Sequence, residues 1–112
     1  RGHGLTPEGD DLLAAALVLS AVPAAAIEPG DAEEGRKIAR MCSACHGRDG
    51  VAVRANTPNI AGQDPGYMAE QLVHFRSGDR VHPEMNVVAK GLSDEQIANL
   101  AAWFGSQPIP SN

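Results

Sequence analysis

The sequence is poor in aromatic residues, and this limits the hydrophobic core that the chain can form by itself. Its 112 residues include four of them: Tyr67, Phe75, Trp103 and Phe104. A single domain of this size buries a modest fraction of its surface and often needs an additional stabilising group. An apolar group bound inside the fold would supply the missing centre of the core.

Positive charge is also scarce. Nine Lys and Arg residues stand against 14 Asp and Glu residues, so the formal net charge is −5. This balance argues against a nucleic-acid partner. Five basic residues nevertheless surround one short segment, with Asp49 as the one acid among them: Arg36, Lys37, Arg40, Arg48 and Arg54. They form either a basic surface that steers docking to an acidic partner or ordinary solvated helix faces.

Only two cysteines are present, and both belong to the segment Cys42-Ser43-Ala44-Cys45-His46. Cys-x-x-Cys-His is the attachment motif of a c-type haem. The two thiols add to the two vinyl groups of one porphyrin, and the adjacent imidazole lies over the iron. The sequence therefore predicts one haem c, bound covalently through Cys42 and Cys45, with His46 as an iron ligand.

Three other kinds of site use a pair of cysteines, and each fits this sequence less well. A thiol redox pair is expected at a strand-to-helix turn in a longer α/β chain. A zinc site needs two further Cys or His ligands at short spacing, whereas His3, His74 and His82 are scattered along the chain. A plain disulfide is the remaining alternative.

An apolar run at residues 12–22, followed by Pro23 and three alanines, resembles the core and cleavage site of a secretory signal peptide. The run is too short to span a bilayer comfortably. Glu8, Asp10 and Asp11 stand where a signal peptide carries positive charge, so a retained N-terminal helix is the competing interpretation. We expect residues 1–29 to be a signal-peptide-like segment or an N-terminal extension, with membrane contact only if the apolar run is retained.

Helix signals mark three segments of the remaining sequence, which start at the predicted N-caps Asp31, Asp64 and Ser93. The first helix is expected to run through Ile38 and Met41 into the cysteine motif. No β pattern of useful length and no internal repeat is present. The sequence therefore predicts an all-α domain with a single haem.

The ends of the second and third predicted helices also have local signals. Pro65 suits the first position of the second helix, and Gly78 suits its end. Gln96 completes a capping box at the start of the third helix, which Gly105 and Pro108 close. Residues 47–63 are rich in Gly, Asn and Pro and are expected to form a loop.

A second iron ligand is expected from Met85, which lies in a loop-like run at residues 80–86. A thioether is a soft, neutral ligand, and a His/Met pair raises the reduction potential. His82 is the competing ligand, and Met85 as a core residue is the other alternative. Met41 is too close to the haem motif to reach the opposite face. Met68 is expected in the core, and His74 on a helix surface.

Longer stretches of the sequence resemble a class I c-type cytochrome of the cytochrome c4/c553-like, single-haem branch. The resemblance covers residues 30–106, with 107–112 as a C-terminal tail, and it is carried by five segments: 30–35, 42–47, 57–63, 67–80 and 92–104. It implies a small class I cytochrome c fold, in which three main helices and loops surround one covalently bound haem c. Gly35 would let the first helix cross the last one against Leu100 and Trp103.

The resemblance also implies roles for other residues. The carbonyl of Pro58 would accept the Nδ1 proton of His46 and so orient the imidazole. Arg76 or Arg80 would pair with a haem propionate, with plain surface positions as the alternative. Tyr67 would pack near the haem or a propionate, or simply in the core.

The function that follows is a periplasmic, exported carrier of single electrons. A His/Met-ligated iron has no open position for a small-molecule substrate, and the sequence contains no catalytic constellation, so we do not expect an enzyme. The expected partners are redox proteins such as a dehydrogenase, an oxidase or a membrane cytochrome complex. Two alternatives remain open: a haem subunit bound permanently to a larger periplasmic dehydrogenase or oxidase complex, and, if Met85 does not ligate, a haem for peroxide chemistry or gas binding.

Overall fold

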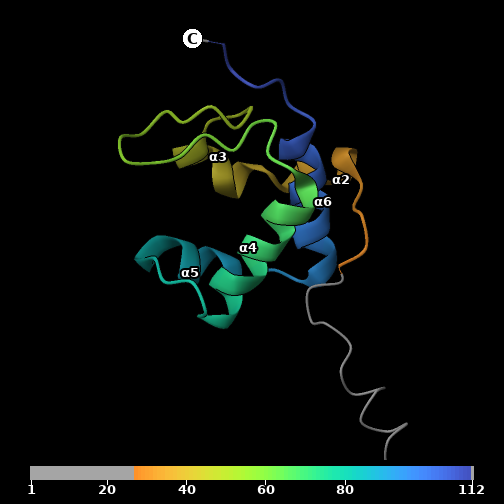
Figure 1. Cartoon of the computed structure of the whole chain (residues 1–112), viewed down its shortest axis with the longest axis vertical. Helices are drawn as coiled ribbons and strands as arrows, with labels where there is room; N and C mark the ends of the chain where they lie inside the picture. The colour runs from red at the N-terminus through yellow and green to blue at the C-terminus, as the bar shows by residue number, and fades with distance from the viewer. Residues whose placement is uncertain (1–26, 112) are drawn as a thin grey trace, which may run out of the picture.

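A computed structural model describes residues 27–111 of the chain, and in this part all regular structure is helical. The apolar run at residues 12–22 and the three alanines after Pro23, which carry the expectation of a signal peptide or a retained helix, lie outside the described residues. In chain order the helices are α2 (Ala32–Ile38), α3 (Arg40–His46), α4 (Pro65–Ser77), α5 (Pro83–Lys90) and α6 (Asp94–Gly105) (Figure 1). The predicted all-α fold is confirmed. None of these helices combines the length and apolar character that a membrane span requires.

The first predicted helix is divided into α2 and α3. Asp31 caps α2 as predicted, because its carboxylate accepts a hydrogen bond from the Glu34 N–H at 3.1 Å. At Ala39 the N–H donates to the carbonyl of Arg36 at 3.3 Å, which is a tighter, three-residue turn. This turn separates the two helices, and α3 continues into the cysteine motif as expected.

The caps of α4 and α6 match the sequence prediction. Asp64 accepts a hydrogen bond from the Tyr67 N–H at 2.9 Å, and Gly78 ends α4 in the left-handed region, with φ +89°. In α6 the capping box is complete: Ser93 and Gln96 each accept from the other's backbone N–H, at 3.1 and 2.9 Å. These caps depend on residues a few positions apart, so the sequence shows them directly.

The expectation of a loop at residues 80–86 is wrong for its second half, because α5 starts at Pro83. His82 is the N-cap, and its Nδ1 accepts from the N–H groups of Glu84 and Met85, both at 3.3 Å. Proline is favourable at the first helical position, where its missing N–H costs nothing. Histidine is not among the usual N-cap residues, and this start was therefore not recognised from the sequence.

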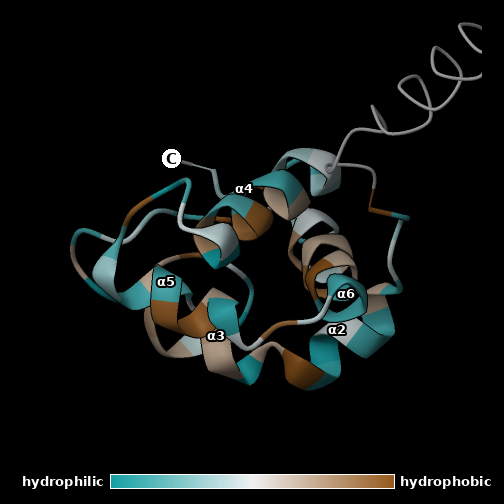
Figure 2. Ribbon diagram, turned by 90° about the horizontal axis from the view of Figure 1, so that it is seen from below, coloured by the Kyte–Doolittle hydropathy of each residue, from teal (hydrophilic) through white to brown (hydrophobic). Residues whose placement is uncertain are grey.

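The core is centred on α6. Its side chains Ile97, Leu100 and Phe104 are fully buried, and Met68 and Leu72 of α4 pack against them. In Figure 1, α6 lies between α2 and α4, while α5 lies beside α4. Figure 2 shows the helices arranged in a ring, with hydrophobic segments on the inner faces of α4 and α6.

The crossing of α2 and α6 is close because Gly35 has no side chain. A Cβ added at Gly35 would overlap the backbone carbonyl of Asn99 and would lie 2.9 Å from the Cβ of Trp103. Gly35 is buried despite its place in a short surface helix. The expected helix crossing at Gly35 is thus present: Trp103 lies opposite Gly35 as predicted, and the nearest atoms belong to Asn99 and not to Leu100.

Replacing Gly35 by Ala should lower the free energy of unfolding of the haem-loaded protein by about 1–3 kcal/mol, because two backbones must move apart. Gly91→Ala is the matched control: φ is −88°, and an added Cβ would have no neighbour within 4 Å. This control should be neutral or more stable by up to about 1 kcal/mol. Denaturant unfolding of both variants measures the difference, and equal midpoints would contradict the close crossing.

Candidate haem site

A cavity of about 350 Å³ lies between α3, the loop 47–63, α4 and α5, with Leu100 and Phe104 of α6 at its base. This volume lies within the range of pockets that hold small molecules and cofactors. Most of its wall is apolar, with polar groups at a few positions. Seven of the eight predicted site residues line it: Cys42, Cys45, His46, Pro58, Tyr67, Arg80 and Met85.

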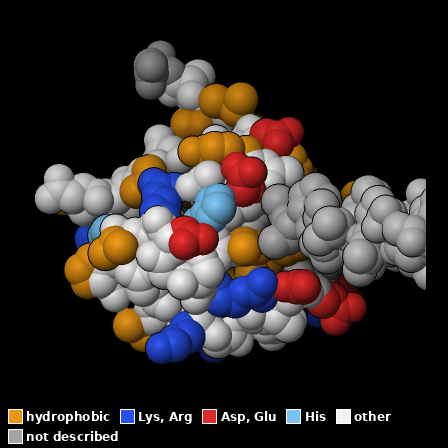
Figure 3. Space-filling model, turned by 60° about the horizontal axis from the view of Figure 1, so that its bottom comes forward, with side chains coloured by type: hydrophobic (Ala, Val, Ile, Leu, Met, Phe, Trp, Pro, Cys, Tyr) orange, Lys and Arg blue, Asp and Glu red, His pale blue; other side chains and the backbone are white. Residues whose placement is uncertain are grey.

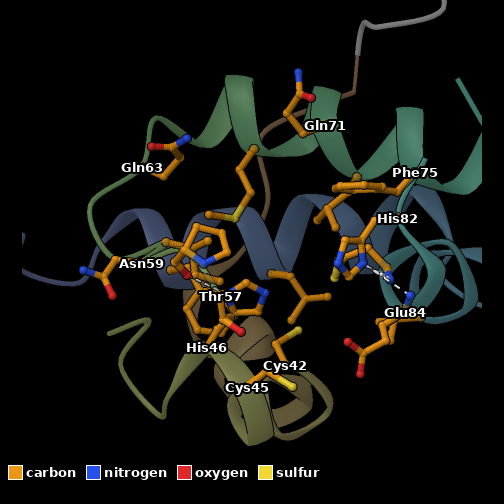
Figure 4. Close-up of a pocket in the computed structure, with 18 of the residues that line it drawn as sticks. Cys42, Cys45, His46, Thr57, Asn59, Gln63, Gln71, Phe75, His82 and Glu84 are labelled. Atoms are coloured by element: carbon orange, nitrogen blue, oxygen red, sulfur yellow. Dashed lines mark hydrogen bonds between the residues drawn. The ribbon is translucent and has the colours of Figure 1, made fainter. Parts of the chain in front are cut away.

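The cysteine motif forms one wall of this cavity. Cys42 and Cys45 are three positions apart in α3, so their thiols lie on the same side of the helix. His46 is the last residue of α3, and Gly47 ends the helix with φ +82°. A Cβ at Gly47 would overlap the carbonyl of Val51. Figure 4 shows the two thiols and the imidazole together on this wall.

The orientation of His46 is set by a backbone group. Its Nδ1 lies 2.9 Å from the carbonyl oxygen of Pro58. A carbonyl can only accept a hydrogen bond, so Nδ1 must carry the proton and donate it. In the neutral imidazole Nε2 is then unprotonated and able to bind a metal. The contact implied by the resemblance is present in the structure.

Cys42 does not have the environment of a reactive thiol. Burial raises the pKa of the Cys42 thiol to about 11. Redox-active cysteines have thiol pKa values below the ordinary range, because the thiolate is the reactive form. A thiol that is protonated at neutral pH therefore argues against the thiol redox alternative.

Met85 and His82, the two candidates for the opposite iron ligand, both line the cavity. Met85 is partly buried on α5 and packs against the core. His82 uses Nδ1 to accept two backbone N–H groups, so its proton must lie on Nε2. A protonated Nε2 cannot bind iron, and ligation by His82 would require loss of the α5 cap. The hydrogen bonds of His82 therefore favour Met85 as the ligand.

The other two methionines also reach the cavity wall. Met68 is 7% exposed and belongs to the hydrophobic core, as expected for its place in α4. Met41 is 45% exposed and comes just before the cysteine motif in α3. Neither position alters the case for Met85, because Met68 has core neighbours and Met41 belongs to the same wall as His46.

The two arginines proposed for a propionate occupy different places. Arg76 does not line the cavity: it donates to the carbonyl of Leu92 at 3.1 Å and pairs with Asp94 at 2.7 Å. These contacts join the end of α4 to the start of α6, so the structure does not bring Arg76 to the site. Arg80 does line the cavity, where it donates to Gln71 at 2.8 Å and lies over the ring of Phe75.

Tyr67 lines the cavity and is 48% exposed, so it belongs to the rim and not to the core. Other polar residues of the lining come from the loop 47–63, α4 and α5, and Figure 4 shows four of them: Asn59, Gln63, Gln71 and Glu84. Polar groups at a rim suit a ligand that is apolar at its centre and charged at one edge.

Asn86, next to Met85 in α5, was not recognised from the sequence. Its Nδ2 donates to the carbonyls of Phe75 and Arg80, both at 2.9 Å. Its Oδ1 accepts from the His82 N–H at 2.8 Å. One side chain thus ties α5 to the end of α4 and to the turn between them. Because all three partners are backbone groups, no residue pattern in the sequence indicates these bonds.

The donor groups of the cavity fit a haem c. Two thiols on one wall suit the two vinyl groups, and the imidazole of His46 and the thioether of Met85 suit the iron. The apolar walls suit the porphyrin.

Residues 30–104 match the family model described as cytochrome C oxidase, cbb3-type, subunit III. The chain belongs to this family of c-type cytochromes. It is also 38% identical over 98 residues to cytochrome c4 of Pseudomonas aeruginosa, covering 88% of this chain and 49% of that protein. Cytochrome c-554(548) of Halomonas halodenitrificans is 40% identical over 81 residues, which cover 70% of this chain and 98% of that protein.

Solved structures agree with the sequence comparison. The crystal structure of reduced recombinant cytochrome c4 from Pseudomonas stutzeri superimposes with a TM-score of 0.67 at 36% identity, over 70% of this chain and 46% of that one. A further relative is the cytochrome subunit of sulfide dehydrogenase of Chlorobaculum tepidum, 34% identical over 72% of this chain and 73% of that protein. The chain spans about half the length of the cytochrome c4 proteins that it matches. This cytochrome is thus a class I, c4-like protein, and haem c is its cofactor.

If His82 caps α5 and does not bind iron, His82→Ala should leave the ligand set unchanged while lowering the free energy of unfolding by about 1 kcal/mol. His82→Asn should recover much of this loss, because an Asn side chain can also cap a helix. The optical spectrum of the oxidised protein and denaturant unfolding measure the two effects separately. A changed iron ligand field in both variants would show that His82 is the ligand.

Proposed function

We propose that this cytochrome is a periplasmic carrier of single electrons, with His46 and Met85 as the axial ligands of its haem iron. The observation that carries the proposal is the set of donors around one cavity: the imidazole of His46, with Nε2 unprotonated, and the thioether of Met85 on a different wall. Both ligands are neutral, and their pairing favours a raised reduction potential.

Electron transfer requires that the site change little between the oxidised and reduced states. The haem c supplies the one-electron couple of its iron. His46 is held in orientation by the Pro58 carbonyl. Met85 belongs to α5, and the next residue, Asn86, makes three hydrogen bonds that hold this helix in place. Buried side chains at the base of the cavity, such as Leu100 and Phe104, exclude water. With His46 and Met85 both bound to the iron, the haem would have no position for a substrate.

The surface supports brief encounters with partners. Val53, Val81 and Val87 are more than 70% exposed, and they belong to the loop 47–63 and to the α5 region that border the cavity. Redox encounters use small, weak interfaces, for which isolated apolar residues suffice. On the face in Figure 3, acidic and basic side chains are interspersed.

The basic cluster of the sequence is largely paired with acids. Arg36 and Lys37 pair with Glu33 and Glu34 in the same helix, at 3.0 and 2.9 Å. Arg54 pairs with Glu84. These pairs favour ordinary solvated helix faces over a strongly basic docking surface. A redox partner would then be guided to this surface less by a strong positive charge than by small apolar contacts.

A permanent subunit of a dehydrogenase complex is the second candidate function, and the similarity to the cytochrome subunit of sulfide dehydrogenase favours it. A free carrier should elute at the mass of one chain when it is isolated at native levels from its own cells. A permanent subunit should elute with a second protein in constant ratio, and its apolar exposed residues should be covered. Size-exclusion chromatography with haem detection decides between the two.

Met85→Leu tests the ligation directly. The oxidised wild type should show the weak red-edge band of thioether-to-iron charge transfer, and the variant should lack it while keeping haem attached through Cys42 and Cys45. The reduction potential should fall, because a soft ligand that favours Fe(II) is lost. Met68→Leu is the matched control and should keep the band. A wild type that is high-spin, or that binds CO at once, would contradict the carrier function.

A further inference from the structure

An ion pair joins the two sides of the cavity. Arg54 belongs to the loop that follows the haem motif, and Glu84 belongs to the first turn of α5. Arg54 Nη2 lies 2.5 Å from Glu84 Oε1, and both residues line the cavity. The loop also carries Pro58, which orients His46, whereas α5 carries Met85. The pair therefore connects the segment that holds one proposed ligand to the helix that carries the other.

In residues 27–111, no other hydrogen bond or ion pair of α5 makes this connection. Among the helices, α5 packs mainly against α4. Asn86 bonds to backbone groups of Phe75, Arg80 and His82, which belong to α4 and to the turn after it. These hydrogen bonds fix α5 relative to α4, and they do not reach the loop 47–63. In residues 27–111, the pair of Arg54 and Glu84 is the one ion pair that crosses the cavity.

Both side chains of this pair keep their charge, but solvent screens the attraction between them. The hydrogen bond and charge of Arg54 hold the pKa of Glu84 below its ordinary value, and Glu84 raises the pKa of Arg54. The two side chains are 49% and 58% exposed, so water and salt weaken the attraction. Such a pair can bias a local opening by a few-fold, and it is too weak to set the stability of the whole fold.

We propose that Arg54 and Glu84 are positioning residues for Met85. Their ion pair, here called the clasp, holds α5 closed against the loop 47–63 and so keeps the Met85 thioether in the cavity. When the clasp opens, α5 can swing on its attachment to α4, and a competing ligand can enter in place of Met85. This proposal rests on the proposed ligation by His46 and Met85.

The clasp can be tested by the rate at which imidazole replaces Met85 in the oxidised, haem-loaded protein. At saturating imidazole this rate reports the departure of the thioether. The variants are Arg54→Gln, Glu84→Gln and the double variant. Arg36→Gln is the matched control, because it breaks the exposed pair with Glu33 at 3.0 Å on α2, away from the cavity.

At about 10 mM salt, each single variant should bind imidazole about two- to five-fold faster than the wild type. The double variant should be no faster than the singles, because each removes the same pair. At about 1 M salt the wild-type rate should rise to that of the variants, since the clasp is then screened. Arg36→Gln should keep the wild-type rate, and all four variants should unfold at the wild-type denaturant midpoint.

Each of the following results would overturn the clasp: rates equal to that of Arg36→Gln, additive effects in the double variant, or a salt dependence that Arg54→Gln shares with the wild type. The unfolding measurement provides a further test. If a variant lost as much free energy of unfolding as corresponds to its faster imidazole binding, the pair would act on the whole fold, and the clasp would be overturned. A wild type without the thioether charge-transfer band would overturn the ligation by Met85 itself, so the two failures are distinguishable.

Discussion

The packing of α2 and α4 onto α6 is the constraint on which the rest of the structure depends. Ile97, Leu100 and Phe104 of α6 are fully buried, and both neighbouring helices take their positions from this helix. The close approach at Gly35 fixes how α2 lies against α6, and the turn at Ala39 leads from α2 into α3, which presents the cysteine motif. The packing of α4 against α6 also fixes the position of α5, because α5 packs against α4. The cavity is the space that these two arrangements leave between them.

The two sides of the cavity are held by interactions of different kinds. His46 follows Cys42 and Cys45 in one short helix, and a backbone carbonyl fixes its imidazole. Covalent attachment of haem through the same helix ties this side to the cofactor. The side with Met85 is held by the packing of α5 on α4 and by exposed polar contacts. Segments with few buried contacts open locally at a low cost in free energy. We therefore expect the side of the cavity with Met85 to open before the side with His46.

Local sequence signals predicted most of the helix boundaries. Features without a recognised local signal, such as the start of α5 and the contacts of Arg76, were not predicted. The caps at Asp31, Asp64 and Ser93 depend on residues three positions away, and each is present. The start of α5 was missed because its cap is a histidine. The propionate role of Arg76 could not be judged from the sequence: Arg76 and Arg80 both lie near the end of α4. Packing of α4 against the start of α6 decides that Arg76 turns away from the cavity.

The sequence by itself determined the class of fold, the haem c motif at Cys42, Cys45 and His46, and Met85 as the candidate for the opposite ligand. The haem motif depends on residue types at a fixed short spacing, which the chemistry of the cofactor demands. The fold class depends on helix signals a few positions apart, and Met85 depends on the ligand chemistry of a thioether. Only the tertiary structure decided that the candidate ligands line one cavity, that His82 is occupied as a helix cap, and that Arg54 meets Glu84 across 30 residues. Contacts of this kind arise when separate helices pack on a common core, and no local pattern in the chain encodes them.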